Sequence, residues 1–222
     1  MTARLELRDA RVGYGRIDVL HDLTLVFPRG HVVALLGRNG AGKSSVLGAL
    51  SGTLALRAGH VLLDGVDISR ATPLARARRG ITVVPDDPNV YGALTVEEHL
   101  SLFAAGRSFD AGYDAFPELR PRRAQRAATL SGGERQMLAL SRLVLRSSPV
   151  ILLDEVSRGL APAAAARLYE VIAGLRTSDR TIVAVEQHRD ELLAISDLVY
   201  VLRRGELQWA GLPRELAAVA RG

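Results

Sequence analysis

Four short apolar runs, separated by segments with helical signals, constrain the fold of this 222-residue chain more than any other feature. The runs are residues 31–36, 81–84, 150–153 and 181–185. Each is almost continuous in apolar residues, which is typical of a strand buried on both faces of a parallel sheet. Because such strands alternate here with helical segments, the sequence predicts a parallel sheet covered by helices on both faces.

Other segments have the patterns of antiparallel strands. Residues 5–27 alternate between apolar and polar positions, which predicts a half-exposed antiparallel sheet. Residues 60–68 resemble a hairpin with Asp64 and Gly65 at its tip. A second hairpin is expected at residues 198–209, where Arg203-Arg204-Gly205 separates two apolar runs. We therefore expect antiparallel pairing at the beginning and near the end of the chain.

Between about residue 91 and residue 148 the strand signals disappear. Thr95, with glutamates two and three residues later, predicts the start of a helix. The stretch 106–126 is polar, contains Gly, Pro and Arg, and receives no assignment. The other helices are expected at residues 43–50, 162–175, 189–195 and 213–219.

Composition excludes several classes of site. The chain has no cysteine, which excludes disulfides, cysteine zinc sites and cysteine nucleophiles. Its five histidines have no metal-binding spacing, and no apolar run approaches the ~18 to 20 residues of a membrane span. The N-terminal residues have no apolar core of signal-peptide length. We therefore expect a soluble cytoplasmic protein.

The formal net charge is +5, and much of the excess is arginine in residues 76–79 and 120–126. A nucleic-acid-binding surface is one interpretation of these clusters. A solvated face of an arginine-rich protein, an anionic membrane surface and a protein partner are the alternatives. Because aromatic residues make up only 5% of the chain, no nucleic-acid partner is expected.

Residues 37–44 form the pattern G-x-x-x-x-G-K-S between a predicted buried strand and a predicted helix. Glycines let successive main-chain N–H groups point at phosphate oxygens, and the helix start adds its positive end. A chance glycine-rich turn is the alternative, but the flanking strand and helix are those that the pattern requires. Lys43 is predicted to reach the β- and γ-phosphates, and Ser44 to bind Mg²⁺. The expected nucleotide-binding residues of this segment are Gly37, Arg38, Asn39, Gly40, Ala41, Gly42, Lys43, Ser44 and Ser45.

Two acidic residues, Asp154 and Glu155, follow the third apolar run. The carboxyl ends of parallel strands are where ligands of α/β proteins bind. Asp154 is therefore predicted to hold Mg²⁺ through water, and Glu155 to orient or deprotonate an attacking water. An acidic pair after a strand is by itself weak evidence for a catalytic site. The phosphate loop elsewhere in the sequence strengthens that evidence.

A third motif, Leu-Ser-Gly-Gly-Glu at residues 130–134, precedes an amphipathic helix and lies 24 residues before Glu155, counted from Ser131. With the two preceding motifs it resembles the ATP-binding cassette (ABC) ATPases over essentially the whole chain. The resemblance implies an α/β fold: a P-loop NTPase three-layer core with a mainly parallel sheet, an antiparallel β-subdomain and a helical subdomain. It implies one domain, residues 1–222, with the core at 1–90 and 149–222 and the helical subdomain at about 91–148.

In that family, ATP and Mg²⁺ are bound between two cassettes. The resemblance implies that Ser131, Gly132 and Gly133 contact the γ-phosphate of ATP held by a second subunit, in a homodimer or a heterodimer with another ABC ATPase. It also implies that Tyr14 stacks on adenine, worth about 1–3 kcal/mol. An aromatic residue packed in the core is the alternative for Tyr14.

The chain departs from the family pattern at three positions. Asp86 stands where the family usually has the Gln that couples Mg²⁺ to the transport partner, and it is assigned here to the metal site. The switch position, usually His, falls on Gln187 by spacing or on His188 one residue later, and both are kept as catalytic candidates. Val156 replaces the Pro that usually follows the catalytic Glu, here Glu155.

The resemblance implies an ATPase subunit that energises a separate integral-membrane permease from the inner face of the cell membrane, with a solute-binding protein as an indirect partner. Residues 157–162 and 185–187 most resemble the ATPases of branched-chain amino-acid importers, which favours amino-acid uptake. A non-transport ABC ATPase, the ATPase of an exporter for another solute, and a binding module with degraded catalysis are the alternatives. Intact Lys43 and Glu155 argue against the last.

Overall fold

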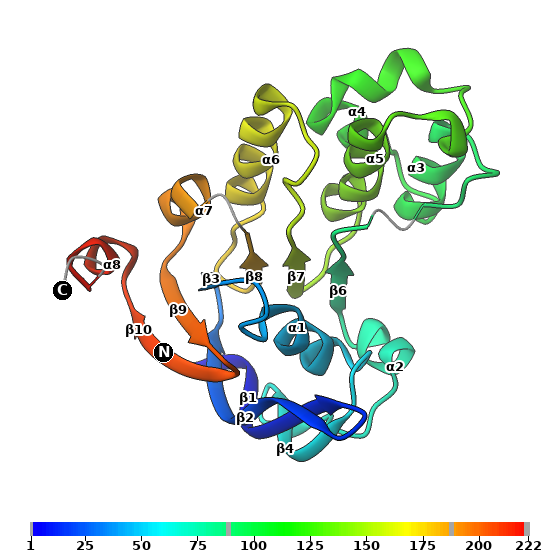
Figure 1. Ribbon diagram of the computed structural model, residues 1–222. Coiled ribbons are helices and arrows are strands. Elements are labelled where there is room, and N and C mark those ends of the chain that lie inside the picture. Colours follow the sequence, from blue (N-terminus) through cyan, green and yellow to red (C-terminus); the bar gives the residue numbers. More distant parts are fainter. Residues whose placement is uncertain (1, 88–89, 187–188, 220–222) are drawn as a thin grey trace. The chain divides into compact units, whose positions relative to one another are not determined.

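The computed structural model describes residues 2–87, 90–186 and 189–219 of the chain, which form two compact units (Figure 1). The core unit comprises Met1–Val83, Pro149–Asp154 and Arg176–Gly222. The helical unit comprises Val84–Ser148 and Glu155–Leu175. The second unit thus includes Glu155–Leu175, whereas the resemblance above places these residues in the core.

A six-stranded sheet with the order β10-β9-β3-β8-β7-β6 forms the centre of the core unit. Its strands are β3 (Val32–Gly37), β6 (Ile81–Val84), β7 (Val150–Asp154), β8 (Thr181–Val185), β9 (Leu198–Arg203) and β10 (Glu206–Gly211). Neighbours β9, β3, β8 and β7 pair in parallel, whereas β10 pairs with β9 antiparallel. All four apolar runs are strands of this sheet, so the predicted parallel sheet is confirmed.

The second sheet of the core unit is antiparallel, with the order β2-β1-β4-β5. Its strands are β1 (Ala3–Tyr14), β2 (Ile17–Pro28), β4 (Leu56–Leu63) and β5 (Val66–Asp67). Apolar side chains such as Leu5 and Leu7 are buried, as the alternating sequence predicted. Asp64 and Gly65 both have positive φ, the geometry of a two-residue hairpin turn, which confirms the expected Asp-Gly tip.

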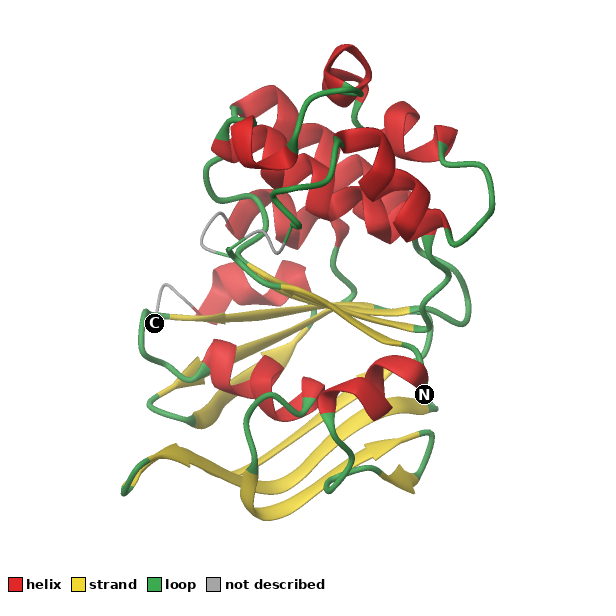
Figure 2. Ribbon diagram, turned by 90° about the vertical axis from the view of Figure 1, so that its right-hand side faces the viewer, coloured by secondary structure: helices red, strands yellow, loops and turns green. Residues whose placement is uncertain are grey.

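Helix α1 (Lys43–Ser51) lies between the two sheets of the core unit and contacts strands of both (Figure 2). Its far end meets Arg76 of helix α2 (Pro73–Arg78). Arg76 is only 2% exposed and donates hydrogen bonds to the carbonyl oxygens of Ala49 and Leu50 at 2.6 and 2.9 Å. Because the last carbonyls of a helix lack hydrogen-bond partners within the helix, this guanidinium caps the C-terminal end of α1. Helices α7 (Arg189–Ile195) and α8 (Pro213–Val219) complete the unit.

The helical unit contains α3 (Val96–Ala104), α4 (Asp110–Ala115), α5 (Gly132–Leu145) and α6 (Pro162–Gly174), with 3₁₀ turns at Pro117–Arg122 and Ala127–Thr129. Thr95 caps α3 with Glu98 in a capping box, as predicted. Helix α4 and the first 3₁₀ turn occupy the stretch that received no assignment. Neither has a side-chain cap, and the buried Tyr113, Phe116 and Leu119 show that packing stabilises them.

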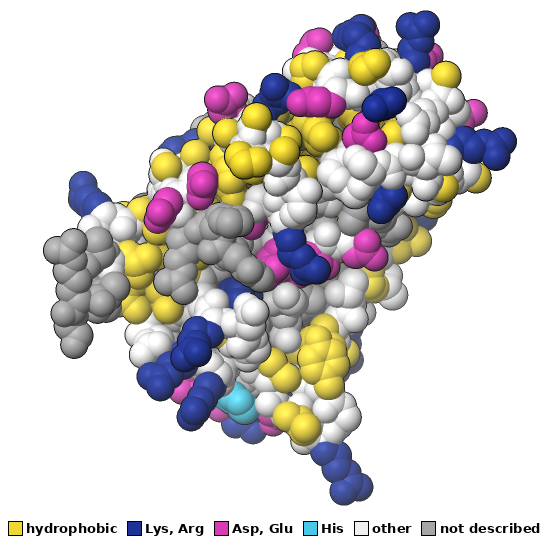
Figure 3. Space-filling model, turned by 45° about the horizontal axis from the view of Figure 1, so that its top comes forward, with side chains coloured by type: hydrophobic (Ala, Val, Ile, Leu, Met, Phe, Trp, Pro, Cys, Tyr) yellow, Lys and Arg dark blue, Asp and Glu magenta, His cyan; other side chains and the backbone are white. Residues whose placement is uncertain are grey.

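The surface of the described part mixes charges of both signs. In Figure 3, basic side chains lie in several separate groups among acidic ones. Within the two arginine clusters, Arg76 is buried, Arg122 pairs with Glu134 at 3.0 Å, and Arg120 lies over the Tyr113 ring at 4.9 Å. These arginines therefore have contacts within the chain. Among the described residues, no helix combines the length and apolarity that crossing a membrane requires.

Candidate functional site

The phosphate loop connects the end of β3 to the start of α1 in the core unit. Gly42 has φ 101°, and a Cβ there would lie 2.7 Å from Leu20 Cδ2, so a larger residue is excluded by both backbone and space. The N–H of Ala41 donates to the Arg38 carbonyl oxygen at 3.0 Å and tightens the loop. A strand, a turn and a helix thus follow one another in the order that lets main-chain N–H groups bind an anion.

Lys43 is the single lysine of the sequence, and it occupies the first residue of α1. The residue is 6% exposed, and its Nζ donates to the carbonyl oxygens of Gly37 and Arg38 at 2.9 and 3.2 Å. These contacts hold the ammonium group over the loop, at the positive end of the helix. An anion seated on the loop would therefore meet the loop's N–H groups and the Lys43 charge together.

Ser44 and Asp154 lie close together, although 110 positions separate them in the sequence. Ser44 Oγ donates to Asp154 Oδ1 at 3.3 Å, which places a hydroxyl oxygen beside a carboxylate at the end of β7. Such hard oxygen donors suit Mg²⁺, which prefers a few protein ligands with phosphate and water as the others. The described residues contain no cluster of three or more His, Cys, Asp or Glu that could hold a metal ion. Ser45, the next residue, is buried in α1.

Tyr14 ends β1 at the turn into β2 and is paired with Ile17. The two side chains are 59% and 72% exposed. The alternative interpretation, a tyrosine packed in the core, is therefore wrong. An aromatic ring presented to solvent is able to stack on a planar ring such as a nucleobase.

In the helical unit, an arginine joins two acidic residues of the expected site. Arg158 Nη1 lies 3.1 Å from Asp86 Oδ2 and 3.8 Å from Glu155 Oε2. Glu155 has φ 46°, an uncommon left-handed conformation for a residue with a side chain. The arginine compensates the charge that Asp86 adds where an amide was expected. The sequence analysis did not identify Arg158. Its position three residues after Glu155 was the feature that could have pointed to this contact.

The signature motif begins α5 through a capping box. Ser131 Oγ accepts from the Glu134 N–H at 3.2 Å, and Glu134 Oε2 accepts from the Ser131 N–H at 2.9 Å. The main-chain hydrogen bond from Ser131 holds the pKa of Glu134 below its usual value, and Arg122 adds to the effect. Gly132 and Gly133 form the first turn and carry no side chain over the helix start. The start of α5 is therefore capped, and it is exposed to solvent at Ser131 and Gly132.

Gln136 of α5 also contacts the segment after Glu155. It is buried and donates from Nε2 to the Val156 carbonyl oxygen at 3.0 Å. Val156 is fully buried, so an apolar residue fits where the family pattern has Pro. The candidates Gln187 and His188 lie outside the described residues, and their assignment stays a prediction.

Comparisons with known proteins agree on one family. A family model for ABC transporters matches residues 20–158. The high-affinity branched-chain amino acid transport ATP-binding protein BraG of Pseudomonas aeruginosa is 37% identical over 201 residues, covering 87% of this chain and 86% of that protein. The probable branched-chain amino acid transport ATP-binding protein LivF of Archaeoglobus fulgidus is 37% identical over 212 residues, covering 92% and 90%.

A solved structure of an ATP-binding subunit of an ABC transporter superposes with a TM-score of 0.83 at 27% identity, covering 98% of this chain and 93% of that one. The expected fold class, a P-loop core with mixed sheets and helices, is confirmed by this likeness and by the strand order above. The family match and the relatives give the chain nucleotide binding and ATP hydrolysis. The chain belongs to the ABC transporter family as an ATP-binding, ATP-hydrolysing subunit.

Proposed function

We propose that this subunit energises a separate membrane permease for the uptake of branched-chain amino acids. The names of two relatives that match it over most of their length support this substrate class. The observation that supports ATP binding is the geometry of the phosphate loop. There Lys43 Nζ donates hydrogen bonds to the carbonyl oxygens of Gly37 and Arg38 at the start of α1. The subunit would act as a peripheral protein at the inner face of the membrane.

Each group of the site has a proposed role. The main-chain N–H groups of residues 37–45 bind the β- and γ-phosphates, and Lys43 adds a positive charge. Tyr14 stacks on adenine with its exposed ring. Glu155 orients or deprotonates the attacking water, and Gln187 or His188 contacts the γ-phosphate. General-base catalysis of this kind typically contributes about 10²–10⁴-fold to a rate.

Ser44 and Asp154 would hold Mg²⁺, with Asp86 as a further candidate. The contact between Ser44 Oγ and Asp154 Oδ1 supports the first two. When bound, the ion supplies positive charge that offsets the negative charge of the phosphate oxygens. Asp154 orients the Ser44 hydroxyl, so the two donors are preorganised in the core unit.

A second copy, or a second ABC ATPase, would complete each site. The 14-residue helix α5 begins at Gly132 and Gly133 and is capped by Ser131, and its exposed start offers main-chain N–H groups to an anion. This helix start would contact the γ-phosphate held by the partner's phosphate loop.

The test replaces Lys43 by Ala in the organism that carries the protein. We expect uptake of radiolabelled leucine, isoleucine and valine to fall to background, and uptake of a sugar to be unchanged. Arg214→Ala, which removes an exposed positive charge elsewhere in the core unit, is the matched control. Normal branched-chain amino-acid uptake by the Lys43→Ala strain would contradict the proposed substrate.

An exporter subunit is the second candidate. The lipopolysaccharide export system ATP-binding protein LptB of Escherichia coli is 29% identical over 223 residues, covering 96% of this chain and 92% of that protein. If the Lys43→Ala strain keeps amino-acid uptake but accumulates an envelope lipid inside the cell, this candidate replaces the importer.

A further inference from the structure

The turn between β1 and β2 carries Tyr14 at its edge. The turn consists of Gly15 and Arg16, and Tyr14 is paired with Ile17 across it. Gly15 has φ 57° and Arg16 has no positive φ, which is the pattern of a type II′ hairpin turn. Because the side chains of Tyr14 and Ile17 are exposed, core packing does not fix this turn. Its position therefore depends on polar contacts.

Arg57 of β4 reaches this turn from another strand of the same sheet. Strand β4 pairs with β1 on the side opposite β2, so the three strands lie in one sheet of the core unit (Figure 1). Arg57 Nη2 donates to the Gly15 carbonyl oxygen at 2.6 Å. Its Nη1 donates to Asp18 Oδ1 and forms an ion pair with this carboxylate. One guanidinium group is thus bonded both to the turn and to the first residues of β2, although 42 positions separate Arg57 from Gly15.

The backbone of β1 leaves room for the guanidinium group. A Cβ at Gly13 would lie 2.7 Å from Arg57 Cζ and 2.1 Å from the Ile17 carbonyl oxygen. Only glycine therefore lets the Arg57 side chain lie against this strand. The Arg57 side chain is 33% exposed, so its polar contacts are partly shielded from water. Arg57 is therefore part of the packed hairpin and not a freely solvated side chain.

We propose that Arg57 is a positioning residue for nucleotide binding that acts through Tyr14, an inference that rests on the proposed stacking of Tyr14 on adenine. The guanidinium group is planar and its donors point in fixed directions, so it holds the Gly15 carbonyl group and Asp18 at a set separation. The turn, and with it the Tyr14 ring, is therefore ordered before a nucleotide binds. Ordering a mobile side chain on binding weakens affinity by about 2- to 12-fold, and the contacts of Arg57 remove this cost.

The experiment compares ATP binding to full-length variants by calorimetry. Arg57→Met keeps the length of the side chain and removes its donors, and we expect about 2- to 12-fold weaker ATP binding. The double variant Tyr14→Ala with Arg57→Met should bind ATP no more weakly than Tyr14→Ala alone, because the ring through which Arg57 acts is gone. The matched control is Arg11→Met, which breaks an ion pair with Asp22 in the same sheet and should leave the ATP affinity unchanged. Thermal unfolding of each variant checks that it folds.

Two further measurements separate positioning of the turn from electrostatic attraction of the triphosphate. Tripolyphosphate has no base, so Arg57→Met should leave its affinity unchanged. Asp18→Ala breaks the same ion pair but removes a negative charge. If Arg57 positions the turn, Asp18→Ala should weaken ATP binding, as Arg57→Met does. An effect of charge alone would instead strengthen ATP binding in Asp18→Ala, because the ligand is an anion.

Failure of the positioning role can be distinguished from failure of the proposed stacking. Unchanged ATP affinity in Tyr14→Ala would contradict the stacking itself, and the role of Arg57 with it. Weaker ATP binding in Tyr14→Ala together with unchanged binding in Arg57→Met would overturn the positioning role alone. Equal losses of ATP and tripolyphosphate affinity in Arg57→Met, a further loss of ATP affinity in the double variant, or unchanged or tighter ATP binding by Asp18→Ala would also overturn it.

Discussion

Arg158 Nη1 lies 3.1 Å from Asp86 Oδ2, so the acidic residue that replaces the expected glutamine has a basic partner within its own unit. The same guanidinium is 3.8 Å from Glu155 Oε2. Arg158 therefore balances the negative charge of Asp86 close to Glu155. The pair links the segment after β6 to the segment after β7.

A double-mutant cycle measures this pair. Asp86→Gln and Arg158→Gln are made singly and together, and urea unfolding gives the free energy of each protein. Because both side chains are exposed, we expect a coupling of about 0.2–1 kcal/mol. The control cycle uses Asp87→Asn with Arg158→Gln, and it should show additivity because Asp87 has no ion pair with Arg158. Equal coupling in the two cycles would show that Asp86 is not the specific partner.

Glu155→Gln should separate ATP binding from hydrolysis. If Glu155 acts on the attacking water, the rate of phosphate release should fall by about 10²–10⁴-fold. Binding of a fluorescent ATP analogue should be unchanged, and sedimentation with saturating ATP should show a dimer. Glu170→Gln, an exposed position on α6 in the same unit, should hydrolyse ATP normally. A Glu155→Gln protein that stays monomeric with ATP would contradict the shared-site dimer.

Lys43→Ala should weaken ATP binding at equilibrium. Loss of a hydrogen bond to a charged group costs about 1.5–3 kcal/mol, which is roughly a 10- to 150-fold weaker affinity. Because Lys43 is the single lysine, an amine-reactive reagent gives a second measurement, with the α-amino group as internal reference. ATP should slow labelling of Lys43 and leave the reference rate unchanged. Equal rates with and without ATP would argue against phosphate binding at this loop.

Tyr14→Ala should weaken ATP binding through lost stacking, by about 1–3 kcal/mol if the ring contacts adenine. Tyr14→Phe keeps the ring and should bind ATP as the unmodified protein does. Because the side chain is 59% exposed, neither change should lower the melting temperature measurably. The same loss of affinity in both variants would assign the effect to the hydroxyl group instead.

Glu134 should contribute pH-dependent stability to the helical unit. Its pKa is lowered in the folded protein, first by the main-chain hydrogen bond from Ser131. A carboxyl with a lowered pKa stabilises the fold above its unfolded pKa, and this contribution is lost as the pH falls through the folded pKa. The stability difference between the unmodified protein and Glu134→Gln, measured by urea unfolding from pH 7 to pH 3, should therefore shrink toward low pH. Glu97→Gln, an exposed change on α3, should give a smaller pH dependence.

Much of the fold was predictable because its signals are local. The apolar runs at β3 and β8 and the Thr95 cap each depend on neighbouring residues. Helix α4 was not predictable, since it has no cap and is stabilised by packing against α5. The approach of Arg158 to Asp86 joins residues 72 positions apart, and no local pattern encodes such a contact.

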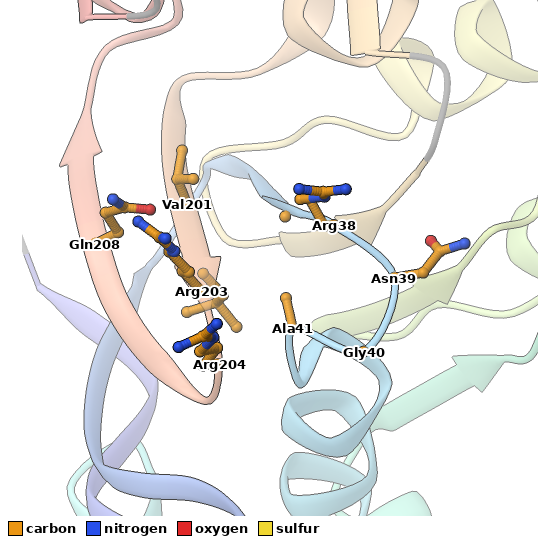
Figure 4. Close-up of a pocket in the computed structure, with 10 residues that line it drawn as sticks. Arg38, Asn39, Gly40, Ala41, Val201, Arg203, Arg204 and Gln208 are labelled. Atoms are coloured by element: carbon orange, nitrogen blue, oxygen red, sulfur yellow. The ribbon is translucent and has the colours of Figure 1, made fainter.

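The motifs predicted the candidate site residues, but not the contacts of their side chains. The position of Ser44 beside Asp154 follows from the parallel order of strands, so it was expected in outline. The position of the phosphate loop beside residues 201–204 was not, because these segments come together only when β9 pairs with β3 (Figure 4).

Arg76 contacts the end of α1 that lies away from the phosphate loop. Its hydrogen bonds join the C-terminal end of α1 to α2. If that end unfolded, the buried guanidinium would lose these partners, and an unpaired buried charge is costly in free energy. Transient unfolding of the helix should therefore start at its N-terminal end, next to the glycine-rich phosphate loop. Amide protons next to Lys43 should exchange with solvent before those near Leu50, and nucleotide would rigidify the end that moves.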